Sequence, residues 1–127
     1  MTAPDEPAVA VRIKWRQTVA EHDYAAAAAY LSLELGDDAD ERAVLRLHDA
    51  ELTSRRANDI LRAAGLATAP LDDPVVMKDL IKAVEGEELS PVLVLSGKRG
   101  SDTADGFHRV SLVYGLDPYA AVPLKVG

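Results

Sequence analysis

Four consecutive apolar residues constrain the fold of this chain more than any other feature of its sequence. Residues 92–95 read Val-Leu-Val-Leu, so both the even-numbered and the odd-numbered positions are apolar. Because successive side chains of a strand point to opposite faces of a sheet, this run predicts a strand that is buried on both faces. Residues 96–101, Ser-Gly-Lys-Arg-Gly-Ser, predict a hairpin turn after it, since two glycines let the backbone bend. Further strands are expected at residues 102–104 and 122–126.

Length, charge and the absence of cysteine narrow the kinds of protein that this chain can be. Its 127 residues suit a single domain with its own core. With no cysteine, disulfides, thiolate metal sites and thiol catalysis are excluded. A formal net charge of −7 argues against nucleic-acid binding, because phosphate contacts need clustered basic side chains. No apolar run approaches the roughly 18 residues of a membrane span and no signal peptide precedes Trp15, so we expect a cytoplasmic protein without a membrane partner.

The first 72 residues are expected to form a disordered tail followed by a helical extension. Residues 1–7 are polar and include two prolines, which is typical of a disordered tail. Residues 9–15 alternate between apolar and polar side chains as a strand would, but their continuation through Val19 fits a helix about as well. We favour the helix, so that residues 8–72 form a helical extension.

Capping residues and apolar periodicity predict four further helices. They are expected at residues 24–35, 40–50, 55–64 and 74–84. Asp23 is the expected cap of the first helix, and Thr53 or Ser54 that of the third. The fourth has Asp73 as its cap and Pro74 at its first position. The wide apolar stripe of this fourth helix is expected to face the core, and it comprises Val76, Met77, Leu80, Ile81 and Val84.

The stretch Ala-Asp-Gly-Phe-His-Arg, residues 104–109, is the candidate functional site. Asp105 is a good N-cap, and Gly106 permits a tight turn, after which residues 107–114 are expected to be helical. A helix that starts so abruptly leaves its first N–H groups without helical partners. His108 and Arg109 lie within that first turn, and both side chains bind phosphate well. The helix start therefore predicts an anion site.

The periodicity of this last helix assigns its side chains to two faces. The face that is expected to point into the core consists of Phe107, Val110, Val113 and Tyr114. His108, Arg109 and Leu112 are expected on the other face, with Arg109 in contact with solvent. An alanine in place of Arg109 is therefore expected to abolish anion binding and to leave the melting temperature nearly unchanged.

The segment 73–127 as a whole resembles the ParB/sulfiredoxin superfamily. In that family a helix, a loop that ends in proline, a buried strand and a hairpin precede a strand that enters a helix with the motif Gly-x-[His/Arg]-Arg, and a proline introduces the last strand. The corresponding parts of this chain are residues 74–84, 88–91, 92–95, 96–100, 102–109 and 122–126. The resemblance implies an α+β fold in which a helical N-terminal half packs on a small mixed sheet. Residues 8–127 then form one domain with residues 73–127 as its core, similar to short bacterial ParB-like proteins with a helical N-terminal extension.

The resemblance also implies roles for the motif residues. In sulfiredoxin-like proteins the His and Arg of the motif hold nucleotide phosphate, and in ParB the motif Gly-Glu-Arg-Arg binds the phosphates of CTP. These roles carry over to Gly106, His108 and Arg109. Phe107 stands where sulfiredoxins have their nucleophilic cysteine, so sulfinic-acid reduction is excluded. The Lys and hydroxyl residues that the family places on the preceding helix are replaced here by Val76, Asp79 and Ala83.

Three functions are compatible with these residues. The first is a nucleotide- or phosphate-binding module, with or without Mg²⁺, in which Lys98 or Arg99 of the hairpin folds over the ligand. The second is a phosphoryl- or phosphodiester-cleaving enzyme that uses Asp105 and a divalent cation, for which the sequence supplies no full set of metal ligands. The third is a non-catalytic interaction protein, such as a regulator or a toxin–antitoxin component. We rank these three functions in this order. The apolar surface of the N-terminal helices also suggests a homodimer.

Overall fold

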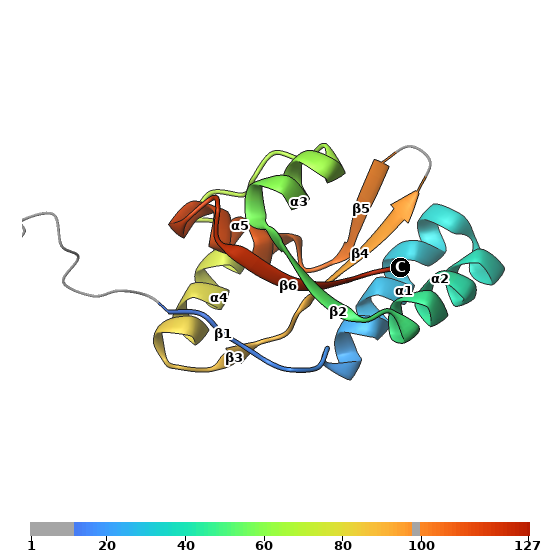
Figure 1. Ribbon diagram of the computed structural model, residues 1–127, viewed down its shortest axis with the longest axis horizontal. Helices are drawn as coiled ribbons and strands as arrows, with labels where there is room; N and C mark the ends of the chain where they lie inside the picture. The colour runs from blue at the N-terminus through green and yellow to red at the C-terminus, as the bar shows by residue number, and fades with distance from the viewer. Residues whose placement is uncertain (1–11, 98–99) are drawn as a thin grey trace, which may run out of the picture.

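Strand β4, Val92–Gly97, is an interior strand of a four-stranded mixed sheet in the computed structural model, which describes residues 12–97 and 100–127 (Figure 1). The order of the strands is β2-β6-β4-β5, where β2 is Leu52–Arg56, β5 is Gly100–Asp105 and β6 is Ala121–Val126. Strand β4 runs parallel to β6 and antiparallel to β5, and β2 runs antiparallel to β6. The architecture is therefore α+β, as the sequence predicts.

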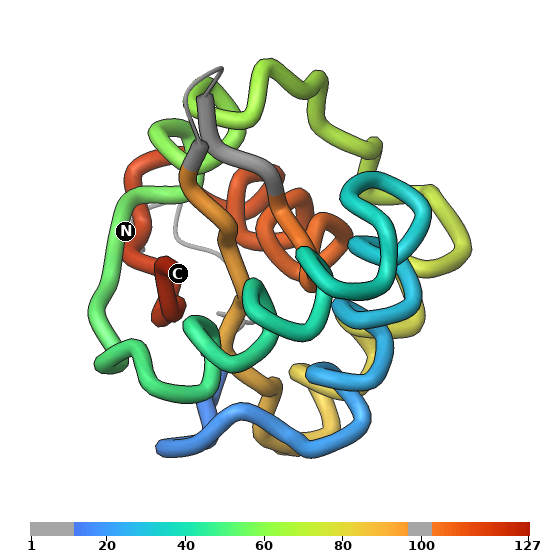
Figure 2. Tube along the Cα trace, turned by 90° about the vertical axis from the view of Figure 1, so that its right-hand side faces the viewer, coloured from blue at the N-terminus to red at the C-terminus, as the bar shows by residue number. Residues whose placement is uncertain are grey.

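Strand β4 is buried on both faces, which confirms the prediction from its unbroken apolar run. Leu93 and Leu95 pack against α1, Glu21–Leu35, and α2, Asp37–Asp49. These two helices lie side by side at the right of Figure 1 and face the viewer in Figure 2. Val92 and Val94 point the other way and pack with apolar side chains of α3, Ala57–Ala64, and α5, Phe107–Leu116. The sheet thus lies between two pairs of helices.

Helix α4, Pro74–Val84, lies on the outer side of α5, near a short parallel pair formed by β1, Lys14–Trp15, and β3, Glu88–Leu89. A small apolar cluster of Val76, Leu89 and Leu112 fills the space between these elements. Leu112 lies on the face of α5 opposite to Val110 and Val113, as the periodicity predicts, but this face is fully buried there. The reason is that α4 covers this face of α5, which a single helix's periodicity does not reveal.

The apolar stripe of α4 is only partly buried. Val76 is buried and Leu80 half-buried, but other apolar side chains of the helix are exposed: Val75, Met77, Ile81 and Val84. The stripe was expected to face the core along its whole length, and that prediction is wrong for Met77, Ile81 and Val84. Helix α4 packs on the protein through one narrow face, because its neighbours are a helix and a two-residue strand instead of a sheet.

The N-terminal half contains two strands where helix was expected. Residues 14–15, part of the helix predicted at 9–15, form strand β1. Residues 9–11 of that prediction and the predicted tail at 1–7 lie outside the described residues. Strand β2 occupies residues 52–56, where the start and the caps of a helix were expected. It pairs with β6 along its full length, from Leu52 opposite Lys125 to Arg56 opposite Ala121. This long-range pairing outweighs the local capping pattern.

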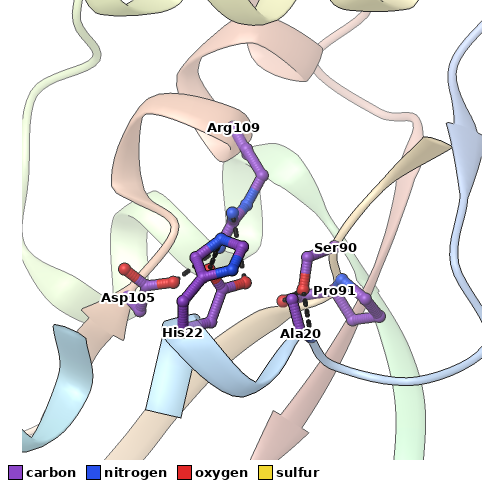
Figure 3. A network of polar contacts seen from close by, with 7 residues as sticks. Ala20, His22, Ser90, Pro91, Asp105 and Arg109 are labelled. Atoms are coloured by element: carbon purple, nitrogen blue, oxygen red, sulfur yellow. Dashed lines mark hydrogen bonds and ion pairs between the residues drawn. The ribbon is translucent and has the colours of Figure 1, made fainter. Parts of the chain in front are cut away.

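Helix starts in the N-terminal half also differ from the prediction. Helix α1 begins at Glu21, and Asp23, the predicted cap, lies inside the helix and is buried. The backbone before the helix is fixed by other partners: the Ala20 N–H group donates to Ser90 Oγ at 3.0 Å, and the Ala20 carbonyl accepts from the Asp23 N–H group at 2.9 Å (Figure 3). Helix α2 runs from Asp37 to Asp49, slightly earlier than predicted.

The predicted start of α4 is confirmed by its hydrogen bonds. Asp73 Oδ1 accepts from the N–H groups of Val75 at 2.9 Å and Val76 at 3.2 Å, and Pro74 is the first helical residue. Helix α5 ends at Leu116, two residues beyond the predicted end at residue 114. Among residues 12–97 and 100–127, no helix has the length and apolar content that a bilayer span requires.

Candidate functional site

Gly106 makes the abrupt turn from β5 into α5. Its backbone is left-handed, with φ 105° and ψ 14°, and it occupies the N-cap position. A Cβ atom added here would lie 2.8 Å from both Val92 Cγ2 and Arg109 Nη2, so the site needs a glycine for space as well as for conformation. Asp105 is the last residue of β5, and no side chain caps α5. The prediction of Asp105 as the N-cap is therefore wrong, because Gly106 holds that position.

Arg109 points inward from α5 and lies between two carboxylates (Figure 3). Its Nη2 donates to Asp105 Oδ2 at 2.8 Å, and its Nη1 lies 3.3 Å from Asp23 Oδ2. The Arg109 side chain is 14% exposed and that of Asp23 only 4%. Arg109 was expected to face solvent, and this prediction is wrong. The reason is that α1 passes beside β5 and brings a buried carboxylate within reach of the guanidinium.

The cluster around Arg109 contains one basic and two acidic side chains, with a histidine beside them. Two carboxylates share one guanidinium, and His22, whose Nε2 lies 3.2 Å from Asp23 Oδ1, is largely exposed. Burial raises the pKa of Asp105, the charge of Arg109 and its hydrogen bond lower it, and the Asp23 carboxylate raises it further; the net shift of the pKa is upward. Arg109 Nε is buried and has no hydrogen-bond partner among the described residues. The charge of Arg109 is thus largely balanced within the protein.

A small cavity of about 160 Å³ opens at the start of α5. It lies between α4 and α5 and is lined by Val75, Asp79, Asp105, Gly106, Phe107, His108 and Arg109. The structure therefore brings Asp105, Gly106, His108 and Arg109 together, as the contiguous motif predicts. Lys98 and Arg99, which were expected to fold over the ligand, lie outside the described residues.

His108 is the more accessible of the two basic side chains that line this cavity. Its side chain is 38% exposed, and its Nε2 lies 3.9 Å from Asp73 Oδ1 at the start of α4. The edge of the half-buried Phe107 ring meets the His108 ring at a centroid distance of 5.2 Å. These contacts hold the imidazole at the mouth of the cavity, where it can act as a hydrogen-bond donor to a ligand.

Asp79 of α4 adds a carboxylate that the site prediction did not include. Burial raises its pKa, while the charges of Arg109, Lys82, His108 and Lys78 lower it, in that order; the net shift of the pKa is upward. In the sequence this residue stood out only as a poor replacement for a phosphate-binding side chain. The cavity therefore contains two carboxyl groups, Asp79 and Asp105, that both retain a proton to higher pH than usual. In the described part of the chain, no three His, Cys, Asp or Glu side chains are grouped closely enough to hold a metal ion.

The raised pKa of Asp79 predicts a pH-dependent gain in stability for Asp79→Asn. A carboxyl group with a raised pKa in the folded state favours folding in its protonated form, so its contribution to stability falls as pH rises from the ordinary value of 3.8 through the raised one. Asn cannot ionise and avoids this loss. We expect the variant to melt at a higher temperature than the wild type at pH 7, and the difference to shrink towards zero below pH 3.8. Melting curves across pH check this, and a variant that is less stable at pH 7 would contradict it.

The chain was compared with known proteins in three ways. No family model matches it, and searches of curated proteins and of solved structures found no significant match.

Proposed function

We propose that this protein binds a phosphate-containing small molecule, such as a nucleotide, in the cavity at the start of α5. One observation carries the proposal. The residues of the first turn of α5, whose N–H groups have no helical partners, line the same cavity as Gly106. Backbone N–H groups and the positive end of a helix dipole are a common binding site for phosphate oxygens.

We further propose that residues 73–127 are related to the ParB/sulfiredoxin superfamily. The elements α4, β4, β5, α5 and β6 follow one another in the order that the resemblance implies. The motif Gly-Phe-His-Arg lies at the turn from β5 into α5, which is its expected place. These observations support a phosphate-binding role for the motif, although Arg109 contacts Asp23 and Asp105 instead of pointing towards solvent.

The charges in the cavity make binding of an anion depend on pH. Ionised Asp79 and Asp105 repel a phosphate, and their pKa values are raised, so both lose their negative charge at higher pH than an exposed aspartate would. Affinity for a phosphate-containing ligand of fixed charge is therefore expected to increase as pH falls through the raised pKa values of Asp79 and Asp105.

Isothermal titration calorimetry with inorganic phosphate, AMP, ATP, CTP and GTP, with and without Mg²⁺, tests the proposal. We expect His108→Gln to weaken binding and Asp79→Asn to tighten it, because the first removes a basic side chain and the second a repelling carboxylate. Arg42→Gln, on the exposed surface of α2, removes a positive charge away from the cavity and serves as the control. Binding that is unaffected by His108→Gln, or no binding at any pH between 5 and 7.5, would refute the proposal.

The same samples distinguish binding from catalysis. Release of product from a nucleotide in the presence of Mg²⁺ or Mn²⁺, and its loss in Asp105→Asn, would favour the phosphohydrolase hypothesis instead. Asn retains a hydrogen-bond acceptor for Arg109, so the cluster stays paired in this variant.

A second function, self-association through α4, is favoured by the exposed apolar side chains of that helix. Met77, Ile81 and Val84 are spaced along one stripe, and each is more than two-fifths exposed. We propose that two copies of the chain bury these stripes against each other. Sedimentation velocity should show a dimer that Ile81→Lys converts to a monomer. The monomer itself should not be destabilised by this substitution, because Ile81 is exposed. A wild-type protein that is monomeric at concentrations of about 100 μM would contradict this.

A further inference from the structure

A second cavity lies between α3 and the sheet. Its volume is about 400 Å³, compared with about 160 Å³ for the cavity at the start of α5. Buried apolar side chains from two strands and from α3 form its floor: Val94, Leu124 and Ile60. This volume and this apolar lining fall in the range of sites that hold small molecules.

Two side chains of opposite charge complete the rim of the cavity. Arg55 extends from β2 and Asp59 from the first turn of α3, and both are exposed. Arg55 Nη1 donates to the Ser54 carbonyl at 2.8 Å and to Thr53 Oγ1 at 3.2 Å, which fixes the guanidinium at the edge of β2. Among the residues that the structure describes, neither Arg55 nor Asp59 has an oppositely charged side chain within ion-pair distance.

We infer that this cavity binds a small apolar molecule that carries both a carboxylate and an ammonium group, such as an apolar amino acid. The floor takes up the apolar side chain, the Arg55 guanidinium binds the carboxylate and the Asp59 carboxylate binds the ammonium group. Asp59 would repel a ligand that carries only a carboxylate, and Arg55 would repel a ligand that carries only an ammonium group. The rim thus selects for a molecule with both charges.

The site is independent of the cavity at the start of α5. The two cavities share no lining residue, and the binding of a dipolar apolar molecule requires neither the motif residues nor phosphate. Failure of phosphate binding at His108 would therefore leave this inference unaffected.

Titration followed by ¹H–¹⁵N correlation spectra tests the inference, with L-phenylalanine and L-leucine as probes. Shift changes are expected at residues of α3, β4 and β6 that line the cavity. 3-Phenylpropionate, which lacks the ammonium group, and 2-phenylethylamine, which lacks the carboxylate, should each bind about fivefold more weakly than L-phenylalanine, the scale expected for one exposed charge pair. Equal affinity for all three compounds, or no shift changes with any of them, would overturn the inference.

Matched variants separate the parts of the site. Arg55→Gln should weaken the binding of L-phenylalanine about fivefold without weakening that of 2-phenylethylamine. Asp59→Asn should also weaken the binding of L-phenylalanine about fivefold, without weakening that of 3-phenylpropionate. Ala63 is an exposed residue of α3 beside the cavity, so Ala63→Trp should fill it and abolish binding in a folded protein. Ala26→Trp, at an exposed position of α1, is the control and should bind normally. Binding that survives Ala63→Trp would also overturn the inference.

Discussion

Arg109→Met is expected to lower the free energy of unfolding by about 3–5 kcal/mol, because it removes the guanidinium that the buried Asp23 and the half-buried Asp105 share. Asp23 is almost fully buried, and Arg109 Nη1 is the cation next to its Oδ2, at 3.3 Å. Methionine fills a similar volume but provides no charge. Urea denaturation followed by circular dichroism measures the change.

A double variant shows whether the unpaired charge causes this loss. Asp23→Asn together with Arg109→Met should recover part of the stability, because the buried group is then neutral. Arg42→Met, on the exposed surface of α2, should change the free energy of unfolding by less than about 0.5 kcal/mol. An Arg109→Met protein as stable as the wild type would mean that Arg109 faces solvent, as the periodicity of the sequence suggests.

Leu112→Ala is expected to cost about 2–5 kcal/mol, since it opens a cavity between α4, α5 and β3. The Leu112 side chain is fully buried against Val76 and Leu89. Leu116→Ala is a matched control on the same helix, because Leu116 is 40% exposed and should lose less than about 1 kcal/mol. Thermal and urea unfolding of the two variants measure the difference.

The comparison of these two leucines tests the orientation of α5. If Leu112→Ala is as mild as Leu116→Ala, then α4 does not cover this face, and the cavity that we assign to ligand binding loses one of its walls. The expected result would support both the position of α4 and the shape of the cavity.

Features that depend on neighbouring residues were predictable from the sequence. The apolar run of β4 indicated burial on both faces, and Asp73 with Pro74 indicated the start of α4, because each pattern acts within a few residues. Strand β2 was not predictable in this way. Its residues 52–56 resemble a helix start locally, and only the pairing with β6 makes them a strand.

In the candidate site, too, only the features that depend on neighbouring residues were predictable. Gly106, His108 and Arg109 meet because they are contiguous, so their proximity could be predicted. The direction of Arg109 could not, because it depends on Asp23, which is far away in the sequence and lies on α1. The sequence contains one indication of this contact. Asp23 lies just before an alanine-rich segment that is expected to be buried, and a carboxylate buried there would need a cation from another element.

The pairing of β2 with β6 also sets the order in which the protein can be completed during synthesis. Leu52 pairs with Lys125, so β2 leaves the ribosome long before its partner does. During that interval its backbone groups are open to pairing with other nascent chains. The charged, exposed side chains of Arg55 and Arg56 discourage such contacts until residues 121–126 pair with the strand.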